Sequence, residues 1–237
     1  MNALDVSAVT VPGRLDPVNL GLPRGSLVGL IGPNGAGKST LLQAAAGILP
    51  ISGKVAWQGR DLRGVSFLER ARCAAWVPHD AHFEFGFSVR SVIAQGRYAH
   101  GDDEKGVDGA LARFDLERLA DRAVNRISDG ERARVLLARA LVTGAPLQLW
   151  DEPLAALDPR HGLEVLLLAR ELAQAGSTVV FSLHDLRIAH DLDLVVVLNE
   201  RRLRAFGPPR EILTPELLLD VFGVRARTGQ GLTLELP

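Results

Sequence analysis

One segment, GPNGAGKST at residues 32–40, constrains the fold of this chain more than any other feature. It satisfies the spacing G-x-x-x-x-G-K-[ST], and it stands between the apolar run SLVGLI at residues 26–31 and the helix-like run LLQAAAGIL at residues 41–49. A strand, a glycine-rich turn and a helix in this order direct backbone N–H groups and the positive end of the helix at phosphate oxygens. We therefore expect a phosphate-binding loop here, in preference to a glycine turn that only joins two elements.

The parts of this loop have different expected contacts. The Lys38 ammonium is expected to reach the β and γ phosphates of ATP, and the Ser39 hydroxyl is expected to bind Mg²⁺. The other contacts come mainly from backbone amides, which glycine allows to turn inward. The residues expected to bind the nucleotide are Gly32, Pro33, Asn34, Gly35, Ala36, Gly37, Lys38, Ser39 and Thr40.

A second apolar run, LQLW at residues 147–150, ends in the acid pair Asp151 and Glu152. A phosphate loop requires a carboxylate on a neighbouring strand, and Asp151 is expected to hold Mg²⁺ indirectly. Glu152 is placed to act as a general base on the water that attacks the γ phosphate. The alternative is an ordinary acid pair at the end of a strand.

The pattern along the chain predicts an α/β fold, because apolar strand-sized runs alternate with helix-like stretches. Between about residues 77 and 141 the strand signals fade and helical spacing replaces them, most clearly at residues 91–97, 108–120 and 131–141. Further strands are expected at residues 147–150, 178–182 and 193–198, and two short helices with proline near their starts are expected in the last thirty or so residues. We expect one domain over residues 1–237, with a core of residues 1–76 and 142–237 and a helical lobe at residues 77–141.

Composition limits the class of partner. The 27 Lys and Arg residues nearly balance 28 Asp and Glu residues, so no overall field favours nucleic acid, and no nucleic-acid partner is expected. The single cysteine, Cys73, excludes an internal disulfide, and the N-terminus does not resemble a signal peptide, which favours the cytoplasm. No run approaches the roughly 18 apolar residues of a membrane-spanning helix, so any crossing of a membrane is expected from other chains.

Four motifs together carry a family resemblance. They are GPNGAGKST, ISDGERARVLLARAL at residues 127–141, LQLWDEPLAALD at residues 147–158 and SLHD at residues 182–185. With these in order, the chain resembles the nucleotide-binding subunits of ABC transporters over nearly its full length. The resemblance implies a P-loop ABC ATPase fold with a RecA-like parallel core, a small N-terminal antiparallel β region and an inserted helical lobe. It also implies a Mg²⁺-dependent ATPase that sandwiches two ATP molecules in a head-to-tail homodimer.

The resemblance also assigns roles to four residues. Ser128 and Gly130 would contact the γ phosphate of the ATP held by the partner subunit, whereas the alternative for Ser128 is a capping box with Glu131. His184 would be the switch histidine that contacts the γ phosphate. Asp158 would couple the two ATP sites, and the alternative, a cap on the helix that begins near Pro159, has equal weight.

The chain departs from the family pattern at three places. His79 stands where the family has a glutamine, and it is expected to contact Mg²⁺ or the attacking water in its place; a separate metal site formed with His82 is disfavoured. The signature motif of the family reads ISDGE at residues 127–131, where LSGGQ is the common form, so Asp129 and Glu131 add negative charge. Residues 9–20 contain no aromatic side chain to stack on adenine, which leaves an apolar contact from Val9 or Val11.

Two segments resemble one branch of the family. SVRSVIAQGR at residues 88–97 and the tail at residues 207–224 look like the ATPase subunits of importers for iron-siderophores, haem and vitamin B12. That branch implies two membrane-spanning permease subunits, an external binding protein and a peripheral location on the cytoplasmic face of the bacterial inner membrane. The aromatic stretch at residues 81–89 would line the docking groove, or else form a buried connection. The competing classes are a soluble ABC ATPase not coupled to transport and a metabolic P-loop kinase.

Overall fold

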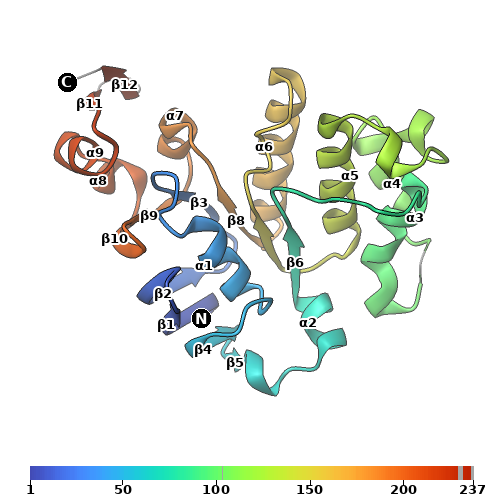
Figure 1. Ribbon diagram of the computed structural model, residues 1–237, viewed down its shortest axis with the longest axis horizontal. Helices are drawn as coiled ribbons and strands as arrows, with labels where there is room; N and C mark the ends of the chain where they lie inside the picture. The colour runs from blue at the N-terminus through green and yellow to red at the C-terminus, as the bar shows by residue number, and fades with distance from the viewer. Residues whose placement is uncertain (103, 229–231, 236–237) are drawn as a thin grey trace.

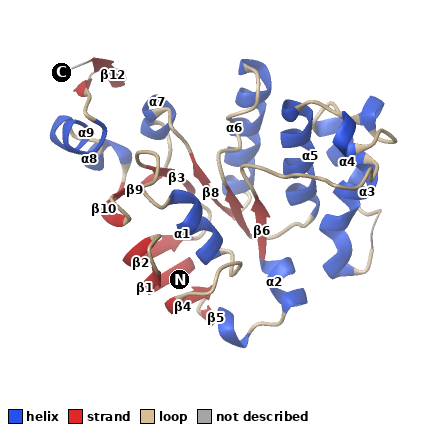
Figure 2. Ribbon diagram, in the orientation of Figure 1, coloured by secondary structure: helices blue, strands red, loops and turns tan. Residues whose placement is uncertain are grey.

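A six-stranded sheet forms the centre of the fold in the computed structural model, which describes residues 1–102, 104–228 and 232–235 (Figures 1 and 2). Five of its strands are parallel and only the edge strand β10 runs antiparallel. The order across the sheet is β10 (Arg202–Gly207), β9 (Leu194–Asn199), β3 (Leu27–Ile31), β8 (Thr178–Ser182), β7 (Leu147–Trp150) and β6 (Ala74–Val77). The strands predicted from the apolar runs are therefore present, and they belong to one sheet.

The two faces of this sheet belong to two hydrophobic clusters. Along β3, Leu27 and Ile31 point into the first cluster, whereas Val28 and Leu30 point into the second, as the two-residue period of a strand requires. Helices α6 (Pro159–Gln174) and α7 (Leu186–His190) cover the first face, and helix α1 (Lys38–Ala45) covers the second. Both faces of the parallel strands are thus buried, which explains their continuous apolar sequences.

A second sheet closes the α1 side of the molecule. It is fully antiparallel, in the order β2 (Leu15–Pro23), β1 (Asn2–Val11), β4 (Ser52–Trp57) and β5 (Arg60–Asp61). Apolar residues of β1, β2 and β4 share the second cluster with α1, so α1 lies between the two sheets. This is the small N-terminal antiparallel region that the family resemblance implies.

Most of the remaining helices gather beyond β6. Helices α3 (Val89–Ala94), α4 (Val107–Arg113) and α5 (Asp129–Val142) pack on one another at the edge of the molecule, and α2 (Phe67–Cys73) precedes β6 (Figure 1). The helix expected at residues 108–120 ends early, because Asp115 adopts a left-handed conformation with φ of 52°. A short 3-10 turn at Glu117–Leu119 occupies part of the remainder.

The chain ends in two short helices and a hairpin. Helices α8 (Pro209–Ile212) and α9 (Pro215–Phe222) each begin with proline, as the sequence predicts, and strands β11 (Arg225–Thr228) and β12 (Leu232–Glu235) pair with each other. In the parts of the chain that the structure describes, every helix is too short or too polar to cross a bilayer.

Candidate functional site

The phosphate loop connects the end of β3 to the start of α1. Its first and last glycines adopt positive φ angles, 154° at Gly32 and 99° at Gly37. A Cβ at Gly32 would collide with the carbonyl oxygen of Leu198, so both the conformation and the close approach to β9 require glycine there. No side chain caps α1, and the free N–H groups of its first turn are directed to the loop.

A cavity of about 410 Å³ lies over this loop. Its lining residues are Gly13, Arg14, Asn34, Gly35, Ala36, Gly37, Lys38, Ser39, Thr40, Glu152 and Arg201. The buried Lys38 donates hydrogen bonds from Nζ to the carbonyl oxygens of Gly32 and Pro33, at 2.8 and 3.2 Å. Burial lowers the pKa of Lys38, while the nearby carboxylates of Glu152 and Asp151 act in the opposite direction. The loop and the acid pair therefore lie close enough to act on one ligand.

The acid pair is held by one serine. Asp151 is only 3% exposed, and its Oδ1 accepts a hydrogen bond of 2.6 Å from the hydroxyl of Ser182. The same hydroxyl accepts a hydrogen bond of 2.8 Å from the backbone N–H of Glu152. Strands β7 and β8 are parallel with Trp150 opposite Phe181, and this register brings Ser182 to the ends of both strands. Ser182 is part of the SLHD motif, but its contact with the acid pair was not predicted, because its partners are distant along the chain.

Glu152 lies at the centre of the three residues expected to be catalytic. Its backbone has a φ of 48°, and its side chain lines both the phosphate cavity and a neighbouring cavity. Nε2 of His184 lies 2.8 Å from Oε1 of Glu152, and Nδ1 of His79 lies 3.7 Å from Oε2. The two imidazoles thus flank the carboxylate.

The neighbouring cavity, of about 340 Å³, contains His79 and His82 beside the N-terminal half of α5. Among the described residues, the only His, Cys, Asp and Glu side chains close enough in threes to hold a metal ion are Asp115, His161 and Glu164. Neither His79 nor His82 belongs to that set of three.

The signature residues begin α5, with the capping box that is the alternative interpretation of Ser128. Ser128 and Glu131 form a complete capping box, in which the Ser128 hydroxyl accepts from the Glu131 N–H and the Glu131 carboxylate accepts from the Ser128 N–H. A Cβ at Gly130 would come within 2.9 Å of the Ala156 carbonyl oxygen. Neither Ser128 nor Gly130 lines the phosphate cavity of its own chain.

Asp158 is the N-cap of α6, in agreement with the capping alternative. Its carboxylate accepts hydrogen bonds from the backbone N–H of His161 at 3.0 Å and lies 2.6 Å from Nδ1 of the same residue. The backbone hydrogen bond from His161 is the largest cause that lowers the pKa of Asp158, followed by the bond from the side chain.

The expected contact of Val9 or Val11 with adenine is wrong. Both side chains are buried in the second hydrophobic cluster. Ala8 has a φ of 48°, and the pairing of β1 with β2 shifts register on either side of Val9, which turns both valines toward the core. Arg14 and Arg201 line the outer part of the phosphate cavity instead.

Known proteins agree with this arrangement. The family described as ABC transporter matches residues 15–155. Cobalamin import ATP-binding protein BtuD of Halobacterium salinarum is 42% identical over 224 residues, which cover 91% of this chain and 56% of the relative. The chain therefore spans little more than half the length of that relative. Hemin import ATP-binding protein HmuV of Streptomyces coelicolor is 45% identical over 216 residues, which cover 88% of this chain and 77% of the relative.

A solved structure extends the match to the whole fold. A chain of a metal-chelate type ABC transporter in an inward-facing conformation aligns with 99% of this chain and 98% of its own length, with a TM-score of 0.82 and 27% identity. The phosphate loop, the acid pair and the capped signature helix occur here in a chain that these proteins match almost from end to end. The chain therefore belongs to the ABC transporter family.

Proposed function

We propose that this chain is the ATP-binding and ATP-hydrolysing subunit of an importer for a metal-chelate type compound, such as an iron-siderophore, haem or cobalamin. One observation carries the proposal: Lys38, on the phosphate loop, and Glu152, beside the buried Asp151, line the same cavity. The names of the halobacterial and streptomycete relatives support the importer class and the kind of compound.

Binding of ATP uses the phosphate loop. The N–H groups of residues 35–40 and the N-terminus of α1 surround the β and γ phosphates. The Lys38 ammonium leaves the carbonyl oxygens of Gly32 and Pro33 and pairs with the phosphates, where a cation gains a stronger, charged partner.

The donor set fits Mg²⁺. Ser39 and Asp151 offer a hydroxyl and a carboxylate, the hard oxygen donors that this ion prefers, and Ser182 orients the carboxylate. When bound, the ion neutralises charge on the β and γ phosphate oxygens. An imidazole nitrogen suits Mg²⁺ less well, and the position of His79 beside Glu152 supports a contact with the attacking water in preference to the ion.

Hydrolysis then depends on Glu152. Its carboxylate takes a proton from a water, the water oxygen bonds to the γ phosphorus, and the bond from that phosphorus to the bridging oxygen breaks to leave ADP and phosphate. His184, 2.8 Å from Oε1, fixes the carboxylate, and this place beside Glu152 supports the contact with the γ phosphate that the family resemblance implies. His79 faces the other carboxylate oxygen.

A second copy of the chain completes the site. Ser128 and Gly130 do not line the phosphate cavity of their own chain, which supports their acting on the ATP of a partner subunit. The N-terminus of α5 offers an N–H group and a hydroxyl to a γ phosphate. Asp158 lies in the segment that would meet the partner, and it is assigned the coupling of the two sites.

Docking to two permease subunits would use the segment before α3. Phe85 and Phe87 are 68% and 49% exposed, and their rings meet edge to face with centroids 6.2 Å apart. Exposed aromatic pairs of this kind favour a partner surface. We assign residues 77–141 to the inserted lobe that carries this surface, and we place the subunit on the cytoplasmic face of the membrane, with an external binding protein delivering the compound.

The Glu152→Gln variant tests the proposal. Because the amide cannot take a proton, steady-state ATP hydrolysis should fall by at least about 100-fold while ATP still binds and holds a dimer. Glu211→Gln, a change at an exposed glutamate on α8, should leave the rate unaltered. A Glu152→Gln protein that hydrolyses ATP at the normal rate would remove this role. Uptake of a radiolabelled chelate into vesicles that contain the permeases separates an importer from an ATPase not coupled to transport.

A further inference from the structure

A cluster of charged side chains joins the end of α4 to the start of α6, outside the phosphate cavity. Asp115 follows α4 in its left-handed conformation, and its carbonyl oxygen and that of Phe114 both accept hydrogen bonds from Nη1 of Arg134 on α5. This bonding holds the turn in place. The Asp115 carboxylate is directed from there toward α6.

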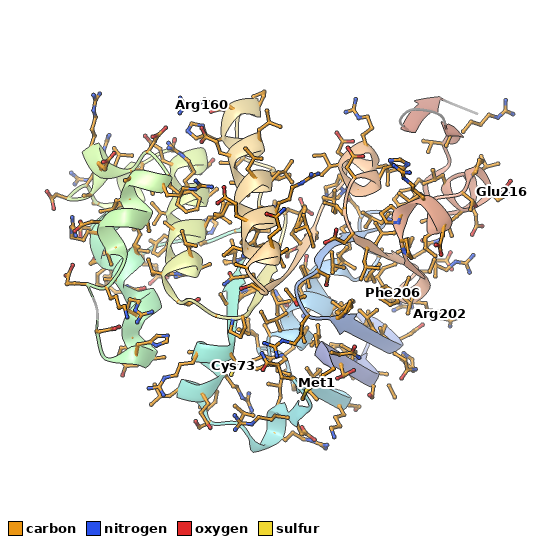
Figure 3. The ribbon with its side chains drawn as sticks, turned by 180° about the vertical axis from the view of Figure 1, so that it is seen from behind. Met1, Cys73, Arg160, Arg202, Phe206 and Glu216 are labelled. Atoms are coloured by element: carbon orange, nitrogen blue, oxygen red, sulfur yellow. The ribbon has the colours of Figure 1, made fainter. Side chains whose placement is uncertain are left out.

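Two residues in the first turn of α6 face this carboxylate. Nη2 of Arg160 donates a hydrogen bond of 3.0 Å to Oδ2 of Asp115, and Nε2 of His161 lies 3.9 Å from the same oxygen. Figure 3 shows Arg160 at the end of α6, on the side of the green helices. Arg160 also donates to Glu164, so one guanidinium serves both carboxylates.

His161 connects this cluster to the loop before α6. Its Nδ1 lies 2.6 Å from Oδ2 of Asp158, while its Nε2 is buried and has no hydrogen-bond partner in the described chain. The side chain is 18% exposed, so its ring has little freedom to turn. The imidazole therefore lies between two carboxylates, Asp158 from the loop that follows β7 and Asp115 from the helices beyond β6.

An N-cap alone does not need this histidine. The backbone N–H of residue 161 already satisfies Asp158 as a cap, whatever side chain that residue carries. The additional bond to the imidazole fixes both oxygens of the Asp158 carboxylate, and Nε2 of the ring lies 3.9 Å from the Asp115 carboxylate in the turn after α4. Two residues before Asp158, the Ala156 carbonyl oxygen lies against Gly130 in the signature segment.

We propose that His161 is a positioning residue, which bridges Asp158 and Asp115 and so sets the loop at residues 154–158 relative to the signature end of α5. The inference rests on the proposed function, because Asp158 matters only if it couples two ATP sites.

A metal ion held by Asp115, His161 and Glu164 is a different explanation of the cluster. It is disfavoured because the Arg160 guanidinium already neutralises both carboxylates.

The test is steady-state ATP hydrolysis by the full chain with its permeases. His161→Ala should lower kcat about five-fold, the effect of one ordinary hydrogen bond, with the KM for ATP within about two-fold of normal and a lower Hill coefficient. His161→Asn should recover most of kcat, since the amide nitrogen stands near the position of Nδ1 and can donate to Asp158. Asp115→Asn, which removes only the charge of an exposed side chain, should give a smaller loss in the same direction.

Arg113→Gln is the matched control. Arg113 pairs with Glu171 at 2.7 Å, so this change also breaks an ion pair between α4 and α6 but does not involve Asp158. It should leave kcat and the Hill coefficient unchanged. An equal loss in Arg113→Gln and His161→Ala would overturn the proposal, because it would indicate a general loosening of the two helices. A loss in His161→Ala that the asparagine variant does not recover would also overturn it.

Further outcomes distinguish failure of the His161 role from failure of the proposed ATPase function. If the normal chain hydrolyses ATP and Glu152→Gln does not, while the His161 variants behave normally, the inference alone fails. A normal chain that does not hydrolyse ATP overturns both. A change in melting temperature or rate on adding Zn²⁺ or a chelator, abolished in His161→Ala, would replace the positioning role by a metal site. Should His161→Ala not fold, the asparagine variant and Asp115→Asn decide the question.

Discussion

The hydroxyl of Ser182 donates a hydrogen bond of 2.6 Å to the Asp151 carboxylate, across two neighbouring parallel strands. The same oxygen accepts the backbone N–H of Glu152. One buried side chain on β8 therefore orients the carboxylate that we assign to Mg²⁺ and fixes the backbone of Glu152, the proposed general base. The phosphate loop at residues 32–40 is far from β8 along the chain. The loop and β8 meet because β3, which leads into the loop, is adjacent to β8 in the sheet.

Loss of this hydroxyl should damage both stability and catalysis. In Ser182→Ala, a buried carboxylate loses a donor and a backbone N–H loses its acceptor, which should cost about 1–3 kcal/mol of unfolding free energy and lower kcat at least about ten-fold. Ser26→Ala is the control, since it also removes a buried serine hydrogen bond, 2.8 Å to the Pro23 carbonyl, but far from the acid pair. Urea unfolding and ATPase rates should show a loss of stability in both variants and a loss of rate in Ser182→Ala only.

The negative charge of Glu131 should weaken the ATP-dependent dimerisation of two subunits. Hydrogen bonds from the backbone and side chain of Ser128 lower the pKa of Glu131, so its carboxylate is ionised near the signature serine. Glu131→Gln keeps a capping box but removes one negative charge from the surface that would meet a triphosphate, and ATP-dependent dimerisation should strengthen about five-fold. Analytical ultracentrifugation with ATP measures the dimer affinity of the Glu152→Gln protein with and without Glu131→Gln. Glu117→Gln in the same background is the control. Equal dimer affinities would show that solvent screens this charge.

Arg14 should contribute to nucleotide affinity. It lines the outer end of the phosphate cavity, where a guanidinium can stack on a base or pair with a phosphate. Arg14→Ala should raise the dissociation constant for ATP about five-fold. The exposed Arg24, which is not among the residues that line the cavity, provides the control variant Arg24→Ala. Calorimetric titration with ATP and with tripolyphosphate distinguishes the two contacts, because a base contact affects only ATP. Unaltered affinity for both ligands would exclude either contact.

Stability should fall in acid because of the capping box before β6. A hydrogen bond from the Ser66 side chain is the largest cause that lowers the pKa of Glu69, from 4.5 to about 2. A carboxyl group whose pKa is lower in the folded than in the unfolded state stabilises the folded protein at pH values above its unfolded-state pKa. That contribution to stability is lost as the pH falls from about 4.5 toward about 2. The melting temperature should therefore drop over this range, and Glu69→Gln should make the drop shallower. Glu84→Gln, a change at an exposed glutamate before α3, should keep the normal slope; the same slope in both variants would contradict the assignment.

Much of the fold follows from local pattern. Strands β7 and β8 have the bounds that their largely apolar runs predict, because a short run of four or five residues that is buried on both faces has few alternatives. The short last helices follow equally well from their prolines. The early end of α4 could not be predicted in this way, since the left-handed turn at Asp115 is fixed by Arg134 from another helix.

The candidate site also contains residues that the sequence predicts and residues that it does not. The phosphate loop and the acid pair are contiguous motifs, and their residues lie together as the motifs predict. Ser182, at the end of β8, and Arg201, in the turn between β9 and β10, come from distant parts of the chain, and their contacts depend on strand order, which motif spacing does not reveal. The error at Val9 came from a register shift in β1, which period-two alternation does not reveal.

The position of β3 between β8 and β9 also determines when the phosphate loop can form during synthesis. Both strands that flank β3 are near the C-terminal end of the chain, so the ribosome must make most of the protein before this central strand has any neighbour in its sheet. At about 5–20 residues per second, the apolar β3 segment waits for many seconds without a partner. The antiparallel pair β1 and β2 lacks this delay, since a tight turn joins them. The nascent chain therefore carries β3 without its sheet neighbours for most of its translation, and the nucleotide site is among the last parts of the molecule to assemble.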